Sequence, residues 1–229
     1  MKNYKAVLFD LDGTLVDSVD DLAYGVNSVM DFFRKPRFTR EEVARMIGKG
    51  VRVLLERACE ARDFVAEPAF IDQVQTLYER IMTQRAPGKA QFYPGALEAV
   101  EQMRASGYRT VLVTNKSEAM TKDFLKKQNI EHLFDLVVTP NKDRRPKPSG
   151  DMLRSALYDL GCDCKECLMV GDSRNDALEA AACGMDVALV ETGYNEGEPI
   201  DRWARKNGFD NVRKDVAAVW QWLKNNSPE

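Results

Sequence analysis

The chain has 229 residues, of which 44% are hydrophobic and 30% charged, and its net charge is −3. This composition is typical of a globular protein with a sizeable core, organised as one large domain or two small ones. A nucleic-acid surface would need clustered Lys and Arg, and a membrane span would need roughly 20 consecutive apolar residues. We therefore expect a cytoplasmic protein, a monomer or homodimer, whose partners include neither nucleic acid nor a membrane.

The five cysteines are an odd number, and three of them, Cys162, Cys164 and Cys167, lie close together in the sequence. Reduced thiols suit a chain of this size better than a disulfide framework. A structural zinc site usually takes four ligands in two pairs, and the single histidine, His132, is distant in sequence. We interpret the three cysteines as part of a turn between a helix and a strand.

The first predicted element is a buried strand at residues 6–9, and no convincing strand follows it before residue 92. Helical spacing recurs instead. Thr39 and Glu42 form a capping-box pattern at the start of one helix, and Pro68 suits the first turn of another. We expect residues 16–91 to form a separate α-helical cap that acts as a lid over the catalytic ends of the strands.

From residue 92 onward, short β-branched runs alternate with amphipathic stretches, which predicts a parallel sheet with helices on both faces. The predicted strands are continuous apolar runs, as buried parallel strands are. They cover residues 110–113, 136–139, 168–170 and 187–190. The predicted helices lie around residues 97–103, 153–160 and 177–182. The fold class is therefore α/β, a doubly wound Rossmann-like core of residues 1–15 and 92–229 with the cap inserted.

Polar residues follow four of these strands. Ligands of an open α/β sheet bind outside the carboxyl ends of its strands, so these residues should meet at one edge. They occupy positions 10–14, 114–116, 147 and 171–176. Carboxylates, a hydroxyl and an ammonium group together are the groups that phosphoryl transfer requires.

Asp10 and Asp12 lie two residues apart across a turn. One carboxylate can attack phosphorus and form an acyl phosphate, while the other can protonate the leaving oxygen and then deprotonate water. Gly13 lets the backbone approach the phosphate closely. A single Asp-Gly step is also a common turn, so this pair alone is weak evidence.

The remaining groups complete such a site. Thr114 can donate a hydrogen bond to a phosphoryl oxygen, and Lys147 can neutralise charge on the nucleophile and the transferred group. Asp172 and Asp176 supply oxygen ligands that suit Mg²⁺. Each residue could instead be an ordinary cap or loop residue, but it is improbable that all are, since they occur in order after predicted strands.

These four segments resemble the four motifs of the haloacid dehalogenase superfamily, and the resemblance extends over essentially the whole chain, cap included. Asp12 is typical of the phosphatase branch, because the dehalogenase branch has no acid there. The resemblance implies that Thr114 and the backbone of Asn115 bind phosphate. The segments that carry it are Asp10-Leu11-Asp12-Gly13-Thr14-Leu15, Thr114-Asn115, Lys147 and Gly171-Asp172-Ser173-Arg174-Asn175-Asp176.

The resemblance also implies individual roles. Asp10 would be the nucleophile and Asp12 the general acid and base. The metal, Mg²⁺, would be bound by the carboxylates of Asp10 and Asp172 and by the backbone carbonyl of Asp12. Asp176 would support the water shell of the metal or orient Lys147.

Within the superfamily the chain looks most like the phosphoglycolate phosphatase group, and this makes 2-phosphoglycolate the best single expectation among small phosphorylated metabolites. The loop at residues 140–145 departs from the usual Gly-Asp-rich version in that group. The segments that resemble the group are 92–95, 113–116, 172–176 and 193–200.

A carboxylated substrate needs a cation. Lys49 and Arg52, beside Gly48 in the cap, are candidates for pairing with that carboxylate when the cap closes, and Lys116 is a further candidate. The alternative for Lys49 and Arg52 is that they are solvated charges on a helix surface.

Other functions remain open from the sequence. Pyrophosphate or a nucleoside monophosphate could be the substrate. A phosphomutase would share the nucleophile but would need additional acid or base groups in the cap, and none is clear in residues 45–57. A non-catalytic binding protein on the same scaffold would be expected to lack one of the motif residues, and all are present.

Overall fold

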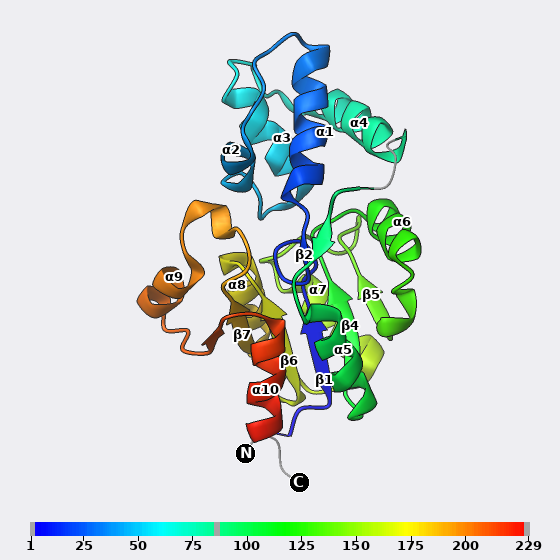
Figure 1. Ribbon diagram of the computed structural model, residues 1–229, viewed down its shortest axis with the longest axis vertical. Helices are drawn as coiled ribbons and strands as arrows, with labels where there is room; N and C mark the ends of the chain where they lie inside the picture. Colours follow the sequence, from blue (N-terminus) through cyan, green and yellow to red (C-terminus); the bar gives the residue numbers. More distant parts are fainter. Residues whose placement is uncertain (1–2, 85–87, 227–229) are drawn as a thin grey trace.

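The computed structural model describes residues 3–84 and 88–226. A six-stranded sheet, parallel throughout, forms the core of the larger part of the molecule (Figure 1). The predicted α/β class with a parallel sheet is confirmed. In spatial order the strands are β5 (Leu136–Val138), β4 (Arg109–Val113), β1 (Ala6–Phe9), β6 (Cys167–Gly171), β7 (Asp186–Val190) and β8 (Val212–Arg213).

Helices cover both faces of this sheet because alternate strand residues point to opposite sides. Val7 and Phe9 of β1 belong to one core cluster, and Ala6 and Leu8 belong to another. The helices of the first cluster are α5 (Ala96–Ala105), α6 (Glu118–Gln128) and α10 (Val216–Asn226). The helices of the opposite face are α7 (Asp151–Leu160), α8 (Arg174–Cys183) and α9 (Ile200–Asn207).

The five predicted strands are all present, and each expected range differs from the observed one by at most a residue at either end. The edge strand β8 was not predicted. It has two residues and pairs only with β7, so it carries no hydrophobic run that could be recognised in the sequence. Cys162 and Cys164 lie in the turn between α7 and β6, as expected, whereas Cys167 is the buried first residue of β6 itself. The described cysteines form no disulfide.

The helical block between β1 and α5, which we call the cap, stands at one end of the sheet (Figure 1). It encloses its own apolar core. The predicted capping box is present, since Thr39 accepts from the backbone of Glu42 while Glu42 accepts from the backbone of Thr39, and Pro68 is the first residue of its helix. The cap helices are α1 (Val19–Phe32), α2 (Arg40–Ala44), α3 (Gly50–Glu60) and α4 (Pro68–Gln84).

The chain enters and leaves the cap through two short antiparallel strands, β2 (Val16–Asp17) and β3 (Gln91–Phe92) (Figure 1). This pair lies in the stretch where the sequence indicated no strand before residue 92. Two residues per strand give no alternating pattern, so the pairing arises from tertiary structure alone.

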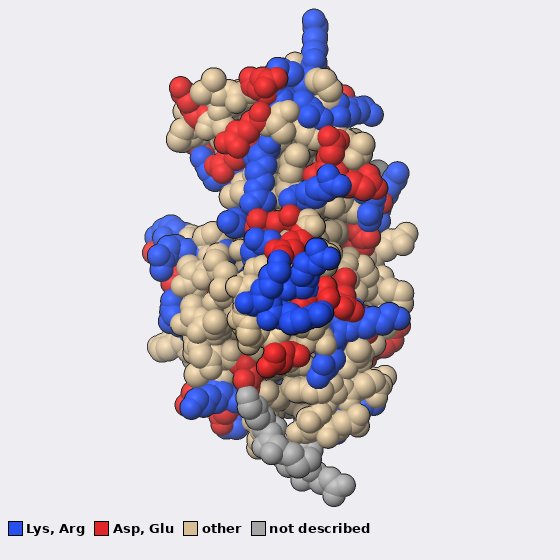
Figure 2. All heavy atoms as spheres, turned by 90° about the vertical axis from the view of Figure 1, so that its left-hand side faces the viewer, with Lys and Arg blue, Asp and Glu red and all other residues tan. Residues whose placement is uncertain are grey.

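The surface carries charges of both signs. On the face drawn in Figure 2, basic and acidic side chains are interleaved over the cap and over the core. No helix among the described residues has the length and apolar character needed to cross a bilayer.

Candidate active site

The polar residues predicted to meet do so at the carboxyl ends of three adjacent strands. Asp10 follows β1, Thr114 follows β4 and Asp172 follows β6. Because β1 lies between β4 and β6, with Phe9 opposite both Leu112 and Val170, the three loops begin at the same level. The parallel register therefore brings side chains more than 150 residues apart in sequence to one edge.

Lys147 is the buried cation of this edge. Its Nζ lies 3.0 Å from Oδ1 of Asp10 and 2.6 Å from Oδ1 of Asp176, and it donates to the carbonyl of Val113 at 2.9 Å. Burial alone would lower the pKa of Lys147, but the two carboxylates outweigh it and the pKa is raised. Lys147 is therefore held as a fixed positive charge beside Asp10.

Asp10, Asp172 and Asp176 form an acidic cluster whose nearest oxygens all lie within 4.8 Å of one another. Burial raises the pKa of Asp10 to about 7, with Lys147 opposing the shift and Asp176 adding to it. Burial, with the charges of Asp176 and Asp10, also raises the pKa of Asp172 well above its usual range. One ammonium group does not balance three carboxylates, so this set of hard oxygen donors fits a divalent cation such as Mg²⁺.

Contacts from two segments orient Asp172. Its Oδ1 accepts from the hydroxyl of Thr14 at 3.0 Å, and its Oδ2 accepts from the backbone N–H of Tyr194 at 3.0 Å. Gly13 has a φ of +98°, and a Cβ there would come within 2.5 Å of Oδ2 of Asp172. Position 13 therefore requires glycine for both its backbone conformation and its close approach to Asp172.

Asp176 is fully buried and belongs to the first turn of α8. Its Oδ2 accepts from the backbone N–H of Ser173 at 3.1 Å and from the hydroxyl of Ser173 at 2.7 Å, while Oδ1 faces Lys147. Ser173, rather than Asp172, is the N-cap of α8. Asp172 is thus left to face the site.

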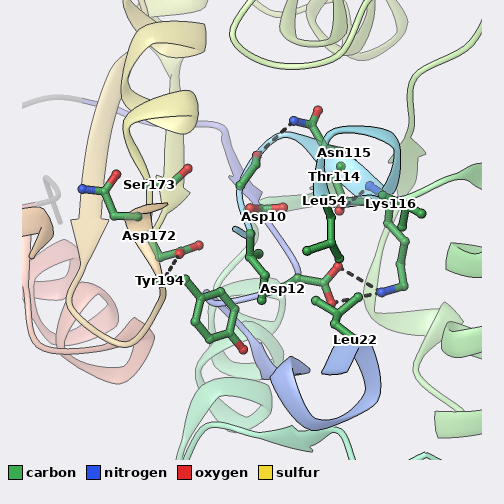
Figure 3. A pocket seen from close by; sticks show the side chains of 15 residues that line it. Asp10, Asp12, Leu22, Leu54, Thr114, Asn115, Lys116, Asp172, Ser173 and Tyr194 are labelled. Atoms are coloured by element: carbon green, nitrogen blue, oxygen red, sulfur yellow. Dashed lines mark hydrogen bonds and ion pairs between the residues drawn. The ribbon is translucent and has the colours of Figure 1, made fainter. Parts of the chain in front are cut away.

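Asp12 lies apart from the acidic cluster and pairs with Lys116 (Figure 3). The Nζ of Lys116 lies 3.1 Å from Oδ1 and 3.0 Å from Oδ2 of Asp12. The backbone N–H of Lys116 donates to the hydroxyl of Thr114 at 3.2 Å. The two aspartates of the first motif therefore occupy different electrostatic surroundings.

A cavity separates these groups from the cap (Figure 3). Its volume is about 50 Å³, a third of the roughly 150 Å³ that admits a benzene molecule. The space between the cap and these groups is therefore narrow in this arrangement of the two parts. The cap residues that line the cavity are Leu22, Ile47, Gly48, Gly50, Val51 and Leu54.

The carbonyl of Gly48 joins the cap to the core. It accepts from Nδ2 of Asn115 at 3.4 Å and from Nδ2 of Asn175 at 3.1 Å. Asn115 also holds the segment that carries Lys147, since its Oδ1 accepts from the N–H of Lys147 at 2.8 Å and its Nδ2 donates to the carbonyl of Lys147 at 3.2 Å. One amide side chain thus contacts both the cap and the segment that carries Lys147.

The structure does not bring the two expected cap cations into the cavity. Lys49 is exposed and does not line it. Arg52 lies on the outer surface, where it pairs with Asp72 at 2.5 Å and with Glu56 at 3.2 Å. Their neighbours Gly48 and Gly50 do line the cavity, because α3 begins there, whereas the side chains of Lys49 and Arg52 are directed away from it.

Two contacts between cap and core were not anticipated from the sequence. Arg57 of α3 forms an ion pair with Glu196 of the core, and Asn175 binds the cap. Asn175 and Glu196 lie inside segments that the sequence already marked, at 171–176 and 193–200. Arg57 had no distinguishing signal, since in sequence it looks like any other charged residue of an amphipathic helix.

The sequence matches the family model of haloacid dehalogenase-like hydrolases over residues 7–190. The phosphoglycolate phosphatase of Nitrosospira multiformis is 36% identical over 198 residues, which cover 86% of this chain and 87% of that protein. The phosphoglycolate phosphatase of Aliivibrio fischeri is 34% identical over 202 residues, which cover 87% of this chain and 89% of that protein.

Solved structures resemble the fold over nearly its whole length. A predicted phosphoglycolate phosphatase from Haemophilus somnus superposes with a TM-score of 0.87 at 29% identity, covering 97% of this chain and 99% of that one. A predicted phosphatase from Clostridium acetobutylicum superposes with a TM-score of 0.82 at 20% identity, covering 97% and 99% of the two chains. At 20% identity the second likeness concerns the fold alone.

Proposed function

This chain belongs to the haloacid dehalogenase-like hydrolases, and from that premise we propose that it is a phosphatase of small phosphate monoesters, with 2-phosphoglycolate as the first candidate substrate. The observation that carries the proposal is the position of Asp10. Its carboxylate lies at the end of the central strand, beside the ammonium group of Lys147 and below the cap cavity that it lines.

In the proposed mechanism, a carboxylate oxygen of Asp10 attacks phosphorus while the bond from phosphorus to the ester oxygen breaks. Asp12 gives its proton to that leaving oxygen, so that an alcohol departs and an aspartyl phosphate remains. Asp12 then takes a proton from a water molecule as the water attacks phosphorus. Inorganic phosphate leaves and the carboxylate of Asp10 is restored.

The other residues stabilise and position the transferred group. The hydroxyl of Thr114 and the backbone of Asn115 would bind its oxygens, and Lys147 would offset the charge that accumulates between Asp10 and the phosphate. Bound Mg²⁺ would supply charge neutralisation and alignment of the phosphate. The residues proposed to hold it are Asp10, Asp172 and the carbonyl of Asp12, with Asp176 supporting them.

The cap side of the cavity favours hydrolysis over a mutase reaction. Among the described residues that line it, the six from the cap are apolar residues or glycines, so none can serve as an acid or base for a second hydroxyl. A phosphomutase must return the phosphoryl group to such a hydroxyl, which needs proton transfer at that position.

The substrate assignment rests on the curated relatives, which are phosphoglycolate phosphatases. The test is phosphate release, with Mg²⁺ and with a chelator, from 2-phosphoglycolate, pyrophosphate, nucleoside monophosphates and an aryl phosphate. A Mg²⁺-dependent preference for 2-phosphoglycolate is the expected result. A preference for another ester would overturn the substrate assignment but not the proposed reaction. Failure to release phosphate from any of these compounds would overturn the proposed phosphatase activity.

A further inference from the structure

Lys116 holds an unusual place in the cavity. Among the described residues that line it, Lys116 is the single Lys or Arg side chain. Its side chain is 10% exposed and that of its partner Asp12 is 18% exposed, so water screens this ion pair only weakly. Figure 3 shows the ammonium group directed at both oxygens of Asp12, close to Leu22 and Leu54 of the cap.

Four other cations near the cap–core boundary have partners elsewhere, and Arg45 and Lys49 of the cap are exposed and do not line the cavity. Lys147 is bound between Asp10 and Asp176. Arg57 pairs with Glu196. Arg40 and Arg52, on the cap, pair with the surface aspartates Asp17 and Asp72 and with other acids. A negatively charged leaving group inside the cavity would therefore find its counter-ion in Lys116, the single cationic side chain among the described residues that line it.

We propose that Lys116 determines specificity by exchanging Asp12 for a carboxylate on the leaving group of the substrate. This inference rests on the proposed phosphatase function and extends it. Before substrate binds, Lys116 holds the carboxylate of Asp12. When a carboxylated ester binds, its carboxylate takes the ammonium group, and Asp12, released from the pair, takes up a proton from solvent and faces the ester oxygen.

The exchange suits the electrostatics of a poorly solvated site. One carboxylate replaces another on the same ammonium group, so the ion pair gained with the substrate compensates for the one lost with Asp12. An ester with an uncharged leaving group offers no replacement, so Lys116 stays on Asp12. Because Asp12 is the proton donor, such an ester would bind less tightly and also react more slowly.

The local geometry sets the length of the substrate. The Nζ of Lys116 lies 3.0 Å from Oδ2 of Asp12, the group proposed to protonate the ester oxygen, so a carboxylate that takes this ammonium group lies close to that oxygen. Phosphate and carboxylate must then sit on neighbouring atoms of a short chain. This describes a monoester with a carboxylate one or two carbons from the ester oxygen.

The test compares 2-phosphoglycolate with ethyl phosphate, which lacks the carboxylate, in wild type and in Lys116→Met with Mg²⁺ present. We expect the ratio of kcat/KM for the two esters to fall by about 30-fold or more in Lys116→Met, in line with the loss of a buried charge partner. Lys116→Arg keeps the charge and should restore part of the ratio. Lys122→Met removes a cation from α6, the helix that follows Lys116. Lys122 pairs on the surface with Glu118, so this change should leave both values unchanged.

The outcomes separate the two proposals. Hydrolysis of both esters by the wild type with no preference for the carboxylate would overturn the role of Lys116 and leave the phosphatase intact. Equal losses on both esters in Lys116→Met would limit Lys116 to holding Asp12 and overturn carboxylate recognition. Failure of the wild type to release phosphate from any ester would overturn the proposed function and this inference with it. A melting temperature for Lys116→Met close to that of wild type would exclude misfolding as the cause of a fall in the ratio.

Discussion

The guanidinium group of Arg57, on cap helix α3, lies 3.1 Å from the carboxylate of Glu196 in the core, and it also donates to the carbonyl of Met46 at 2.8 Å. The side chain of Glu196 is only 14% exposed. This ion pair bridges cap and core outside the catalytic groups. It therefore stabilises the closed arrangement without taking part in the chemistry.

Arg57→Met should shift the cap toward open conformations, because the carboxylate of Glu196, which is only 14% exposed, loses its cationic partner. We expect kcat/KM for small esters to fall about 10-fold, the effect of roughly 1.4 kcal/mol on closure. Arg52→Met is the matched control, since Arg52 lies on the same helix but pairs only at the surface of the cap. The measurement is steady-state kinetics of the two variants. Equal falls in kcat/KM for Arg57→Met and Arg52→Met would contradict a role for Arg57 in closing the cap.

Gly50→Ala tests the close approach of the cap to Asn115. Gly50 has a φ of +82°, and a Cβ there would lie 3.0 Å from the carbonyl oxygen of Asn115. Gly208 has a φ of +78° with no atom within 4 Å of its Cβ position, so Gly208→Ala carries the same backbone strain without the contact. Both changes should cost about 1 kcal/mol of stability, but only Gly50→Ala should lower kcat/KM. A normal kcat/KM for Gly50→Ala would show that the cap need not approach so closely.

Asp10→Asn should reduce turnover at least about a thousand-fold, as loss of a nucleophile does. The amide keeps the size of the side chain, so melting temperature should change little. Asp12→Asn supplies the complementary test. With an aryl phosphate, whose leaving group needs no proton, it should accumulate a phosphorylated enzyme detectable by mass spectrometry. Absence of that species would argue against the covalent route.

Mg²⁺ should stabilise the folded protein, because the acidic cluster exists only in the native state. At a concentration one hundred times the Kd, the gain is about 2.7 kcal/mol in the free energy of unfolding. Asp172→Asn should remove most of the rise in melting temperature, whereas Asp201→Asn, on the surface of α9, should retain it. A full rise in Asp172→Asn would exclude Asp172 as a ligand.

We expect the stability of the fold to fall in acid partly because of Asp135. Burial opposes its ionisation, but hydrogen bonds from the N–H of Thr110 and from Arg104 prevail and lower its pKa. A lowered pKa means that the ionised group stabilises the fold above the unfolded-state value of about 3.9, and that this contribution is lost as pH falls through the lower folded value. Asp135→Asn should therefore cost about 1 kcal/mol at pH 7.

The measurement is thermal denaturation of Asp135→Asn and wild type from pH 7 down to pH 3. The difference between their melting temperatures should shrink toward the acid end. Asp123→Asn, which loses only a surface pair with Lys127, should remain close to wild type throughout. A difference that stays constant with pH would mean that the ionised form of Asp135 contributes nothing.

The catalytic edge could be predicted from the sequence because its residues follow buried strands directly. Asp10, Thr114 and Asp172 each come one residue after an apolar run, and parallel pairing then determines which of them become neighbours. Lys147 was also recognisable, although it follows β5 only after a loop. The family resemblance implied two alternative roles for Asp176, and contact with Lys147 was one of them.

Side-chain direction in the cap could not be predicted. Lys49 and Arg52 are next to residues that line the cavity, but at the start of α3 their side chains point outward. The spacing of residues in the sequence does not show which way side chains point at a helix start flanked by glycines. The ion pair of Arg57 with Glu196 depends on how two separately folded elements meet. Hydrophobic periodicity carries information about each element alone, so such contacts arise only in the assembled structure.

The antiparallel pair β2–β3 places the two ends of the inserted cap side by side, with Val16 opposite Phe92 and Asp17 opposite Gln91. A segment whose ends are adjacent can be removed and the gap closed with a tight turn, without altering any strand of the main sheet. The cap can in this sense be replaced as a unit. A different cap between β2 and β3 would alter which esters are admitted, while the aspartates of the core keep their arrangement. Such a scaffold can therefore diversify by exchange of whole caps.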